Sequence, residues 1–211
     1  MIKAILFDFD GTIVDSLPHI HAAWKYAFEQ QGHSLSDKEI IEKIFYSTKE
    51  EKIANYGVDA DKLSDDFHIV IYKRQENYVL NPFIEDVLKE LSQRSIKTAI
   101  VTLASSERVK GILDNFCIGY LFTAVLGGKD AGRPKPHPDI ALKAMELLQV
   151  TPEETLLVGD SAMDIETGKN AGVQTGLYMP ENNTQYIDRE LIETAQPNFT
   201  FTNFSELLSK I

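Results

Sequence analysis

A short apolar run followed at once by two carboxylates constrains the fold more than any other part of the sequence. Ala4–Phe7 consists of four apolar residues, which favours a strand buried on both faces of a parallel sheet. Asp8 and Asp10 come next, and strand alternation puts them on one side, about 7 Å apart along the chain. Gly11 then lets the backbone leave the strand tightly. Open α/β sheets bind ligands beyond the carboxyl ends of their strands, so the pattern indicates a site there.

The overall charge limits what such a site can bind. An isolated Asp-x-Asp is commonly a turn with solvated aspartates, but beside a buried strand the pair is costly unless a cation or a shared proton relieves the repulsion. The 211 residues carry a formal net charge of −11 and the pI is about 4.9. This argues against a general binder of nucleic acids or anionic membranes. An anionic substrate would therefore need local positive charge, from a metal or a well-placed lysine.

Two further features concern the compartment. The single cysteine, Cys117, excludes an intrachain disulfide and a cysteine metal cluster, and we expect it to be a packed thiol. The sequence starts directly with a strand, and no apolar run approaches the length needed to span a membrane. We therefore expect a cytoplasmic protein.

The segment between the first strand and the next one is helical. Helical patterns cover four stretches: His19–Gln31, a second helix opened by a capping box at Ser36–Glu39, Lys49–Tyr56, and about Asp61–Val79. A simple crossover between parallel strands needs far fewer residues. We therefore predict that residues 16–80 form an inserted α-helical domain, and that residues 1–15 and 81–211 form the core.

From residue 81 onward, strands and helices alternate, which is typical of an α/β protein. Strands are predicted at Lys97–Leu103, Leu121–Leu126, Thr155–Val158 and, as the last strand of the chain, Gln174–Tyr178. Residues 181–200 are predicted to be loop with at most a short helix near Ile187–Thr194. Asn203 is expected to cap a terminal helix over Phe204–Lys210.

Three later segments carry side chains that could act together with the two aspartates. Thr102 ends a predicted strand, and Lys135 lies among three prolines that stiffen its loop. Asp160 and Asp164 are four residues apart across a strand-to-helix turn. Each has an ordinary alternative, because threonines often end strands, exposed lysines are usually solvated, and aspartates at a helix N-terminus complement its dipole.

Taken in order, these segments resemble the four motifs of the haloacid dehalogenase superfamily of phosphohydrolases. Its signature D-x-D-G-[TV] matches Asp8–Thr12, Lys135 lies in a K-P-x-P-D segment, and G-D-S-A-M-D at Gly159–Asp164 matches the last motif. Thr102 stands at the Ser or Thr of the second motif, but Leu103 replaces the Asn that often follows. The resemblance spans essentially the whole chain. It implies a Rossmann-like doubly wound parallel sheet with a small α-helical cap, as in the phosphoglycolate phosphatase and β-phosphoglucomutase branch.

The resemblance also implies catalytic roles. Asp8 would be the nucleophile that forms an aspartyl-phosphate. Asp10 would be the general acid for the leaving alcohol and then the base for the attacking water. Thr102 and Lys135 would hold the phosphoryl oxygens and neutralise developing charge.

Magnesium is the cofactor that the resemblance implies. Oxygen ligands without a nearby His or Cys suit Mg²⁺, and the ion would offset the repulsion between a carboxylate nucleophile and a phosphate dianion. The implied ligands are Asp8, the backbone carbonyl of Asp10, Asp160, and Asp164 either directly or through water. The expected substrate contacts are Gly11 and Leu103 from the core, and Tyr46 and Lys49 from the turn after the second cap helix.

Several activities remain open on this site. Hydrolysis of a small phosphomonoester is expected, with phosphoglycolate, a sugar phosphate, a nucleotide or pyrophosphate as the substrate. A phosphomutase would use the same site, but Ile20 stands where those mutases have a cap histidine, which favours hydrolysis. A receiver-type signalling domain also clusters Asp, Thr and Lys around Mg²⁺, but it is shorter and lacks the paired aspartates and the cap.

The expected partner is a small phosphorylated metabolite, with no nucleic acid or membrane, and the chain is expected to be a monomer or weak homodimer.

Overall fold

The computed structural model describes the whole chain except Tyr46, Thr48 and the side chains of Lys49, Glu50 and Arg189. Its contacts divide the chain into two compact units. The first unit comprises Met1–Asp15, Leu80–Thr184 and Arg189–Ile211, and the second comprises Ser16–Val79 and Gln185–Asp188. Residues 185–188 thus pack with the helical unit although both flanking segments belong to the first unit.

The first unit is built on a six-stranded sheet in the order β3-β2-β1-β4-β5-β6, in which every neighbouring pair is parallel. The strands are β1 (Ala4–Phe7), β2 (Lys97–Val101), β3 (Ala124–Leu126), β4 (Thr155–Gly159), β5 (Gln174–Tyr178) and β6 (Phe199–Phe201). The predicted doubly wound α/β fold is confirmed. Because β1 lies between β2 and β4, the carboxyl ends of these three strands are neighbours at one edge.

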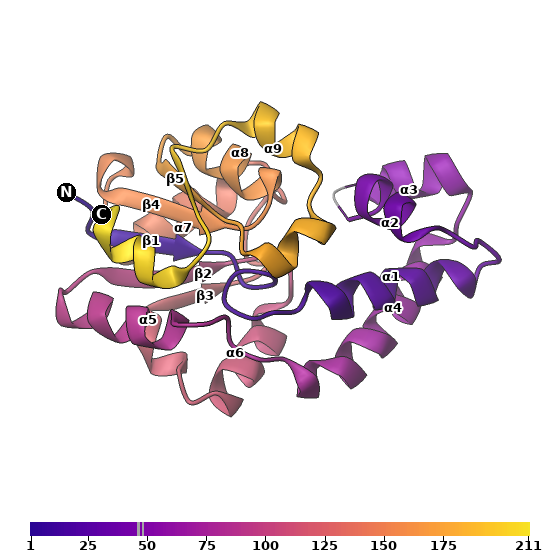
Figure 1. Ribbon diagram of the computed structural model, residues 1–211, viewed down its shortest axis with the longest axis horizontal. Helices are drawn as coiled ribbons and strands as arrows, with labels where there is room; N and C mark the ends of the chain where they lie inside the picture. Colours follow the sequence, from indigo (N-terminus) through magenta and orange to yellow (C-terminus); the bar gives the residue numbers. More distant parts are fainter. Residues whose placement is uncertain (46, 48) are drawn as a thin grey trace. The chain divides into compact units, whose positions relative to one another are not determined.

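Helices cover both faces of this sheet (Figure 1). They are α5 (Ile84–Gln93), α6 (Ser106–Asn115), α7 (Asp139–Leu148), α8 (Ala162–Asn170) and α9 (Arg189–Ala195). Ala4 and Leu6 of β1 pack in one apolar cluster with α7 residues such as Ala141. Phe7, whose side chain points to the other face by strand alternation, contacts the ring of Phe204 near the C-terminus, with centroids 6.4 Å apart. Burial on both faces explains why β1 is apolar throughout.

The second unit is helical, with α1 (Leu17–Glu29), α2 (Asp37–Lys43), α3 (Lys49–Tyr56) and α4 (Ala60–Arg74). Its buried core is formed by Ala27, Phe28, Ile40, Ile44, Val58 and Leu63. The capping box predicted at the start of α2 is confirmed, since the Ser36 hydroxyl accepts a hydrogen bond from the Glu39 N–H and the Glu39 carboxylate accepts one from the Ser36 N–H.

Several element predictions were wrong. The strand predicted over residues 121–126 is limited to Ala124–Leu126, because Gly119–Leu121 forms a 3₁₀ turn. Gln174–Tyr178 is not the last strand, since β6 follows and begins at the end of the stretch predicted as loop. The predicted terminal helix is present as a 3₁₀ helix, Phe204–Ser209, which ends one residue earlier than predicted and is capped by Asn203 as expected.

Two further predictions failed for local reasons. The fourth helix of the insertion ends at Arg74 and is continued by a 3₁₀ turn, whereas the apolar pattern predicted a helix up to Val79. Cys117 is exposed rather than packed. It adopts a left-handed backbone conformation (φ 56°) just after α6, where helices commonly end, so its side chain leaves the apolar face.

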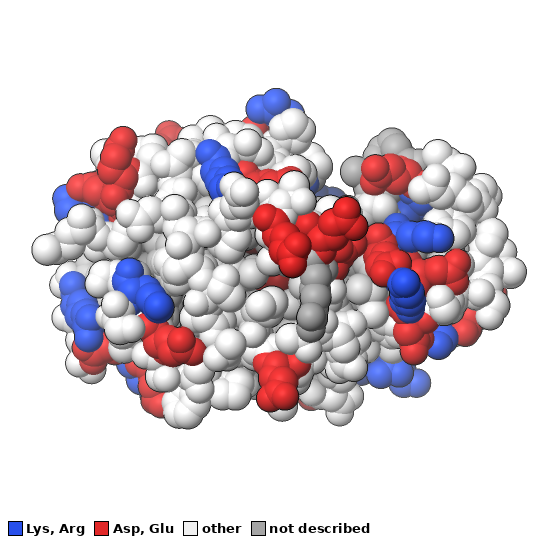
Figure 2. Space-filling model, turned by 45° about the horizontal axis from the view of Figure 1, so that its top comes forward, with Lys and Arg blue, Asp and Glu red and all other residues white. Residues whose placement is uncertain are grey.

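The described surface carries mixed charge. On the face shown in Figure 2, Lys and Arg side chains lie in separate small groups next to Asp and Glu side chains. Positive charge on this face is therefore distributed among acidic neighbours. Within the part of the chain that the structure describes, no helix has both the length and the apolar character needed to cross a membrane.

Candidate active site

Three buried aspartates meet where β1 and β4 end. β1 and β4 pair with Phe7 opposite Val158, and the Asp8 N–H donates to the Val158 carbonyl at 2.8 Å. This register places Asp8 and Asp160 directly after two adjacent strands, and Asp164 follows in the first turn of α8. Carboxylate oxygens of Asp8, Asp160 and Asp164 lie within 4.8 Å of one another.

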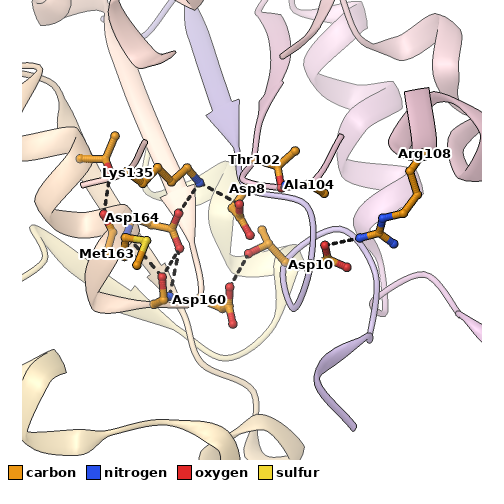
Figure 3. A network of polar contacts seen from close by, with 12 residues as sticks. Asp8, Asp10, Thr102, Ala104, Arg108, Lys135, Asp160, Met163 and Asp164 are labelled. Carbon is orange, nitrogen blue, oxygen red and sulfur yellow. Dashed lines mark hydrogen bonds and ion pairs between the residues drawn. The ribbon is translucent and has the colours of Figure 1, made fainter. Parts of the chain in front are cut away.

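Lys135 reaches this cluster from the loop between β3 and α7. Its Nζ donates to Asp8 Oδ1 at 2.7 Å and to Asp164 Oδ1 at 2.6 Å, so the ammonium lies between the two carboxylates (Figure 3). The side chain is only 2% exposed. A buried lysine is stable here because it has charged partners on both sides.

Burial and mutual repulsion dominate the electrostatics of the cluster. Burial raises the pKa of Asp8 to about 7, against the opposing effect of Lys135. Burial, together with the charges of Asp8 and Asp164, also raises the pKa of Asp160 well above its usual range. Burial alone would lower the pKa of Lys135, but Asp164 and Asp8 outweigh it and raise that pKa. Among the described residues, the three carboxylates would carry more negative charge when ionised than the Lys135 ammonium balances.

The donor set fits a divalent metal ion. Its three members offer buried carboxylate oxygens, the ligands that hard cations such as Mg²⁺ prefer. Burial, and with it repulsion among the carboxylates, raises the pKa values of Asp8 and Asp160, and a bound cation would stabilise their ionised forms. Asp8, Asp160 and Asp164 are thus the side chains that would hold it.

Local structure at the β4–α8 junction fixes two of these carboxylates. The Ser161 hydroxyl accepts a hydrogen bond from the Asp164 N–H, and Asp164 Oδ2 in turn accepts bonds from the Ser161 hydroxyl and N–H. A glycine is required at position 159, next to the Asp164 side chain, because a Cβ there would lie 2.3 Å from Asp164 Cγ. The Thr12 hydroxyl donates to Asp160 Oδ1 at 3.2 Å, which links the turn after β1 to β4.

Asp10 faces a different partner from Asp8. Its Oδ2 accepts a hydrogen bond from Arg108 Nη2 at 2.5 Å (Figure 3). Its other oxygen, Oδ1, is buried and has no hydrogen-bond partner among the described residues. Arg108 is not among the site residues predicted from the sequence. The signal that could have pointed to it is a basic residue in the first turn of the helix after β2, where an acidic one is usual.

The remaining core residues predicted for the site follow β1 and β2. Thr102 is buried directly after β2, and its hydroxyl accepts a hydrogen bond from the Ala104 N–H at 3.2 Å. Leu103 is 49% exposed. Gly11 has φ 81°, a left-handed conformation that a glycine adopts without strain.

Two buried asparagines that the sequence did not single out hold the turn after β1. The side-chain amides of Asn81 and Asn183 both donate to the Gly11 carbonyl, at 3.3 and 3.2 Å. Asn81 also donates to the Thr12 carbonyl at 2.8 Å. These contacts connect segments about 70 and 170 residues from the turn, so they leave no local pattern in the sequence.

The cap residues predicted to touch substrate cannot be compared with the structure. Tyr46 and the side chain of Lys49 lie outside the described residues. The backbone at Lys49 begins α3.

The doubly wound parallel sheet brings three aspartates and a lysine together where β1 and β4 end, so the fold and the site define an α/β protein with a buried, charged site at the carboxyl ends of its strands. The family model described as haloacid dehalogenase-like hydrolase matches residues 5–177. The chain therefore belongs to the haloacid dehalogenase-like hydrolases, and the predicted membership is confirmed.

Similar proteins cover nearly the whole chain. The pyrophosphatase PpaX of Oceanobacillus iheyensis is 32% identical over 216 residues, which cover 99% of this chain and 96% of that protein. The phosphoglycolate phosphatase of Aquifex aeolicus is 32% identical over 218 residues, covering 98% and 95%. Among solved structures, a putative phosphoglycolate phosphatase from Lactobacillus plantarum matches with a TM-score of 0.86 at 21% identity, covering 100% of both chains. That last likeness supports the fold.

Proposed function

We propose that the protein is a Mg²⁺-dependent phosphatase that hydrolyses a small phosphomonoester through an aspartyl-phosphate. The observation that carries the proposal is the buried group of Asp8, Asp160 and Asp164 with Lys135 bonded between two of them. Membership of the hydrolase family and the names of the phosphatase relatives support the same class of reaction.

In the first step, an Asp8 carboxylate oxygen attacks phosphorus while the bond to the leaving-group oxygen breaks. Asp10 gives its proton to that oxygen, so the alcohol leaves in neutral form. Among the described residues Oδ1 of Asp10 has no hydrogen-bond partner, which supports this role, because that oxygen is not committed to another group of the protein.

In the second step, water attacks the phosphorus of the aspartyl-phosphate, and Asp10 takes up the proton of that water. The bond to Asp8 breaks, inorganic phosphate leaves, and both aspartates return to their starting states. Lys135 and Thr102 hold phosphoryl oxygens and neutralise charge during both steps.

The metal would be held by Asp8, Asp160 and Asp164, with the Asp10 carbonyl as a further ligand. When bound, Mg²⁺ would neutralise the dianionic phosphoryl group and so allow a carboxylate to approach it. We also propose that the first unit is the catalytic core. The helical unit, with Tyr46 and Lys49, would act as the cap that selects the leaving group.

The test is phosphate release from a panel of small phosphoesters, including phosphoglycolate, sugar phosphates and nucleotides, with and without Mg²⁺. We expect turnover that requires Mg²⁺ and is lost in EDTA. Calcium should substitute poorly, because its larger and looser coordination misplaces the nucleophile. Full activity after exhaustive chelation would contradict the proposal.

Pyrophosphate is a second candidate substrate, favoured by the pyrophosphatase relative that is 32% identical over 99% of this chain. It belongs in the same panel. Product analysis separates hydrolysis from mutase activity, since a phosphomutase would convert a sugar phosphate to its isomer without releasing phosphate. A receiver-type domain would instead keep phosphate on Asp8 without turnover.

A further inference from the structure

Arg108 lies beside the candidate site in a position that ordinary helix electrostatics does not favour. It is in the first turn of α6, which begins at Ser106 after the N-cap Ser105. A cation there opposes the helix dipole, whose N-terminal end is positive. The Arg108 side chain is nevertheless only 7% exposed, so neither solvent nor a surface location explains its placement. A residue that breaks a local rule in this way is expected to have a compensating anion or a function.

The anion that the structure provides is Asp10. Arg108 Nη2 lies 2.5 Å from Asp10 Oδ2, and the guanidinium carbon lies 6.0 Å from the centre of the Phe9 ring. In the proposed reaction, Asp10 passes a proton to the leaving-group oxygen, which requires an approach of about 2.6–3.2 Å. A guanidinium bonded to Asp10 is therefore within reach of a substituent on the leaving group.

The cationic side chains beside the site indicate which kind of substituent the leaving group would carry. In the described part of the chain, Lys135 and Arg108 are the cationic side chains bonded to the aspartates after β1 and in the first turn of α8. Lys135 already bridges Asp8 and Asp164, where the phosphoryl group would bind. A second anion on the substrate would need a second cation. A guanidinium suits a carboxylate or phosphate, because its planar fork can bind either with two hydrogen bonds.

We infer that Arg108 determines specificity by binding an anionic substituent, a carboxylate or second phosphate, on the leaving group of the substrate. The inference rests on the proposed phosphatase function. In the substrate-free protein Arg108 binds Asp10 Oδ2, and in the complex the guanidinium binds the anion on the leaving group. A substrate with a neutral leaving group leaves the Arg108–Asp10 pair in place.

The first test compares two esters of similar size, 2-phosphoglycolate with an anionic leaving group and ethyl phosphate with a neutral one. For Arg108→Gln, we expect kcat/KM to fall about 10- to 100-fold more for phosphoglycolate than for ethyl phosphate, the range for loss of a hydrogen bond to a charged group. Arg108→Lys should keep part of the preference, since it keeps the charge but loses the fork. The matched control is Arg94→Gln, which removes an exposed arginine paired with Glu90 at the end of α5.

A binding measurement gives an independent readout. In the Asp8→Asn background with Mg²⁺ present, calorimetry measures the Kd of each ester without turnover. Adding Arg108→Gln should weaken the binding of phosphoglycolate while leaving that of ethyl phosphate nearly unchanged. An equal loss for both esters would show that Arg108 only positions Asp10, and no loss for either would show that it contacts no substrate; both results overturn the inference. If the wild-type protein releases no phosphate from any ester, the proposed function itself fails.

Discussion

At the residue scale, the site depends on the opposite surroundings of two aspartates that are only two positions apart. Asp8 is bonded to Lys135 within the buried cluster, whereas Asp10 is bonded to Arg108 and keeps one oxygen without a partner among the described residues. The difference supports assigning the nucleophile to Asp8 and the proton transfer to Asp10. It also makes the two residues separable by mutation.

Substitution of Asp8 should abolish the reaction altogether. Asp8→Asn keeps the size of the side chain but removes the attacking carboxylate, so we expect neither phosphate release nor covalent phosphate on the protein. Mass spectrometry of the intact protein after incubation with substrate measures the second quantity. Substantial turnover by Asp8→Asn would mean that another residue is the nucleophile.

Substitution of Asp10 should slow the reaction without preventing phosphorylation. Asp10→Asn removes the proton donor and base, which is expected to cost about 10²–10⁴ in rate. With a good leaving group such as p-nitrophenolate, the first step needs little acid catalysis, and phosphate should accumulate on Asp8. Unchanged steady-state turnover of natural esters by Asp10→Asn would exclude a role in proton transfer.

At the scale of elements, the junction of β4 and α8 combines a structural and a functional requirement. Ser161 caps α8 and at the same time orients Asp164, whose other oxygen binds Lys135. The Asp164 side chain lies directly against the backbone of Gly159, at the end of β4. The strand end, the helix cap and the candidate metal ligand are therefore a single packed arrangement.

Gly159→Ala should disturb this junction. The added Cβ would lie 2.3–2.4 Å from atoms of Asp164, which cannot move without giving up its bonds to Lys135 and Ser161. We expect the free energy of unfolding, measured by urea denaturation, to fall by about 1–3 kcal/mol. Mg²⁺ affinity should fall as well.

The control for this substitution is Gly111→Ala in α6. A Cβ at Gly111 has nothing within 4 Å, and alanine is favoured over glycine in a helix by about 1 kcal/mol, so this variant should be at least as stable as wild type. If Gly159→Ala were as stable as Gly111→Ala and bound Mg²⁺ normally, the junction would tolerate a side chain and the packing argument would be wrong.

At the scale of the whole molecule, the buried carboxylates make stability depend on pH and on metal. The folded state raises the pKa of Asp8 from 3.8 to about 7 and raises that of Asp160 in the same direction, so it binds more protons than the unfolded state. Stability from Asp8 is therefore lost as pH rises from about 4 to about 7, and the contribution of Asp160 changes with pH in the same direction. Burial of the ionised carboxylates is the main cause of this loss and their mutual repulsion adds to it, and a bound cation offsets both effects.

We expect Mg²⁺ to raise the melting temperature more at pH 8 than at pH 5. In metal-free protein, Asp160→Asn should melt higher than wild type at pH 8, with a smaller difference at pH 5. The comparison with the variant is needed because His21, whose pKa is lowered by burial, contributes stability with the opposite pH dependence. Scanning calorimetry in EDTA and in Mg²⁺ measures both effects. A metal-free wild type that matches Asp160→Asn at both pH values would contradict the assigned repulsion.

Many elements of the fold could be predicted from the sequence because their causes are local. The apolar run of β1, the Ser36 capping box and the Asn203 cap each involve residues within a few positions of one another, so propensity and pattern suffice. The α/β class was predicted from alternating strand and helix patterns, and the doubly wound sheet from a family resemblance that rests on motifs of a few neighbouring residues each. These local patterns were enough to predict which site residues directly follow each strand.

Contacts between residues that are far apart in the chain were established only by the tertiary structure. β6 has three residues and forms because it pairs with β5, where Gly176 leaves room for the ring of Phe199. Arg108 and Asp10 are 98 residues apart in the sequence, and no local sequence pattern predicts their hydrogen bond. The family resemblance implied that Asp8 and Asp160 share a metal ion, and the structure gives the physical cause of their meeting, since β1 and β4, 151 residues apart in register, are neighbours in the sheet. Local propensities do not carry information about such pairings, because the free energy that stabilises them comes from burial and contacts that exist only once the chain has folded.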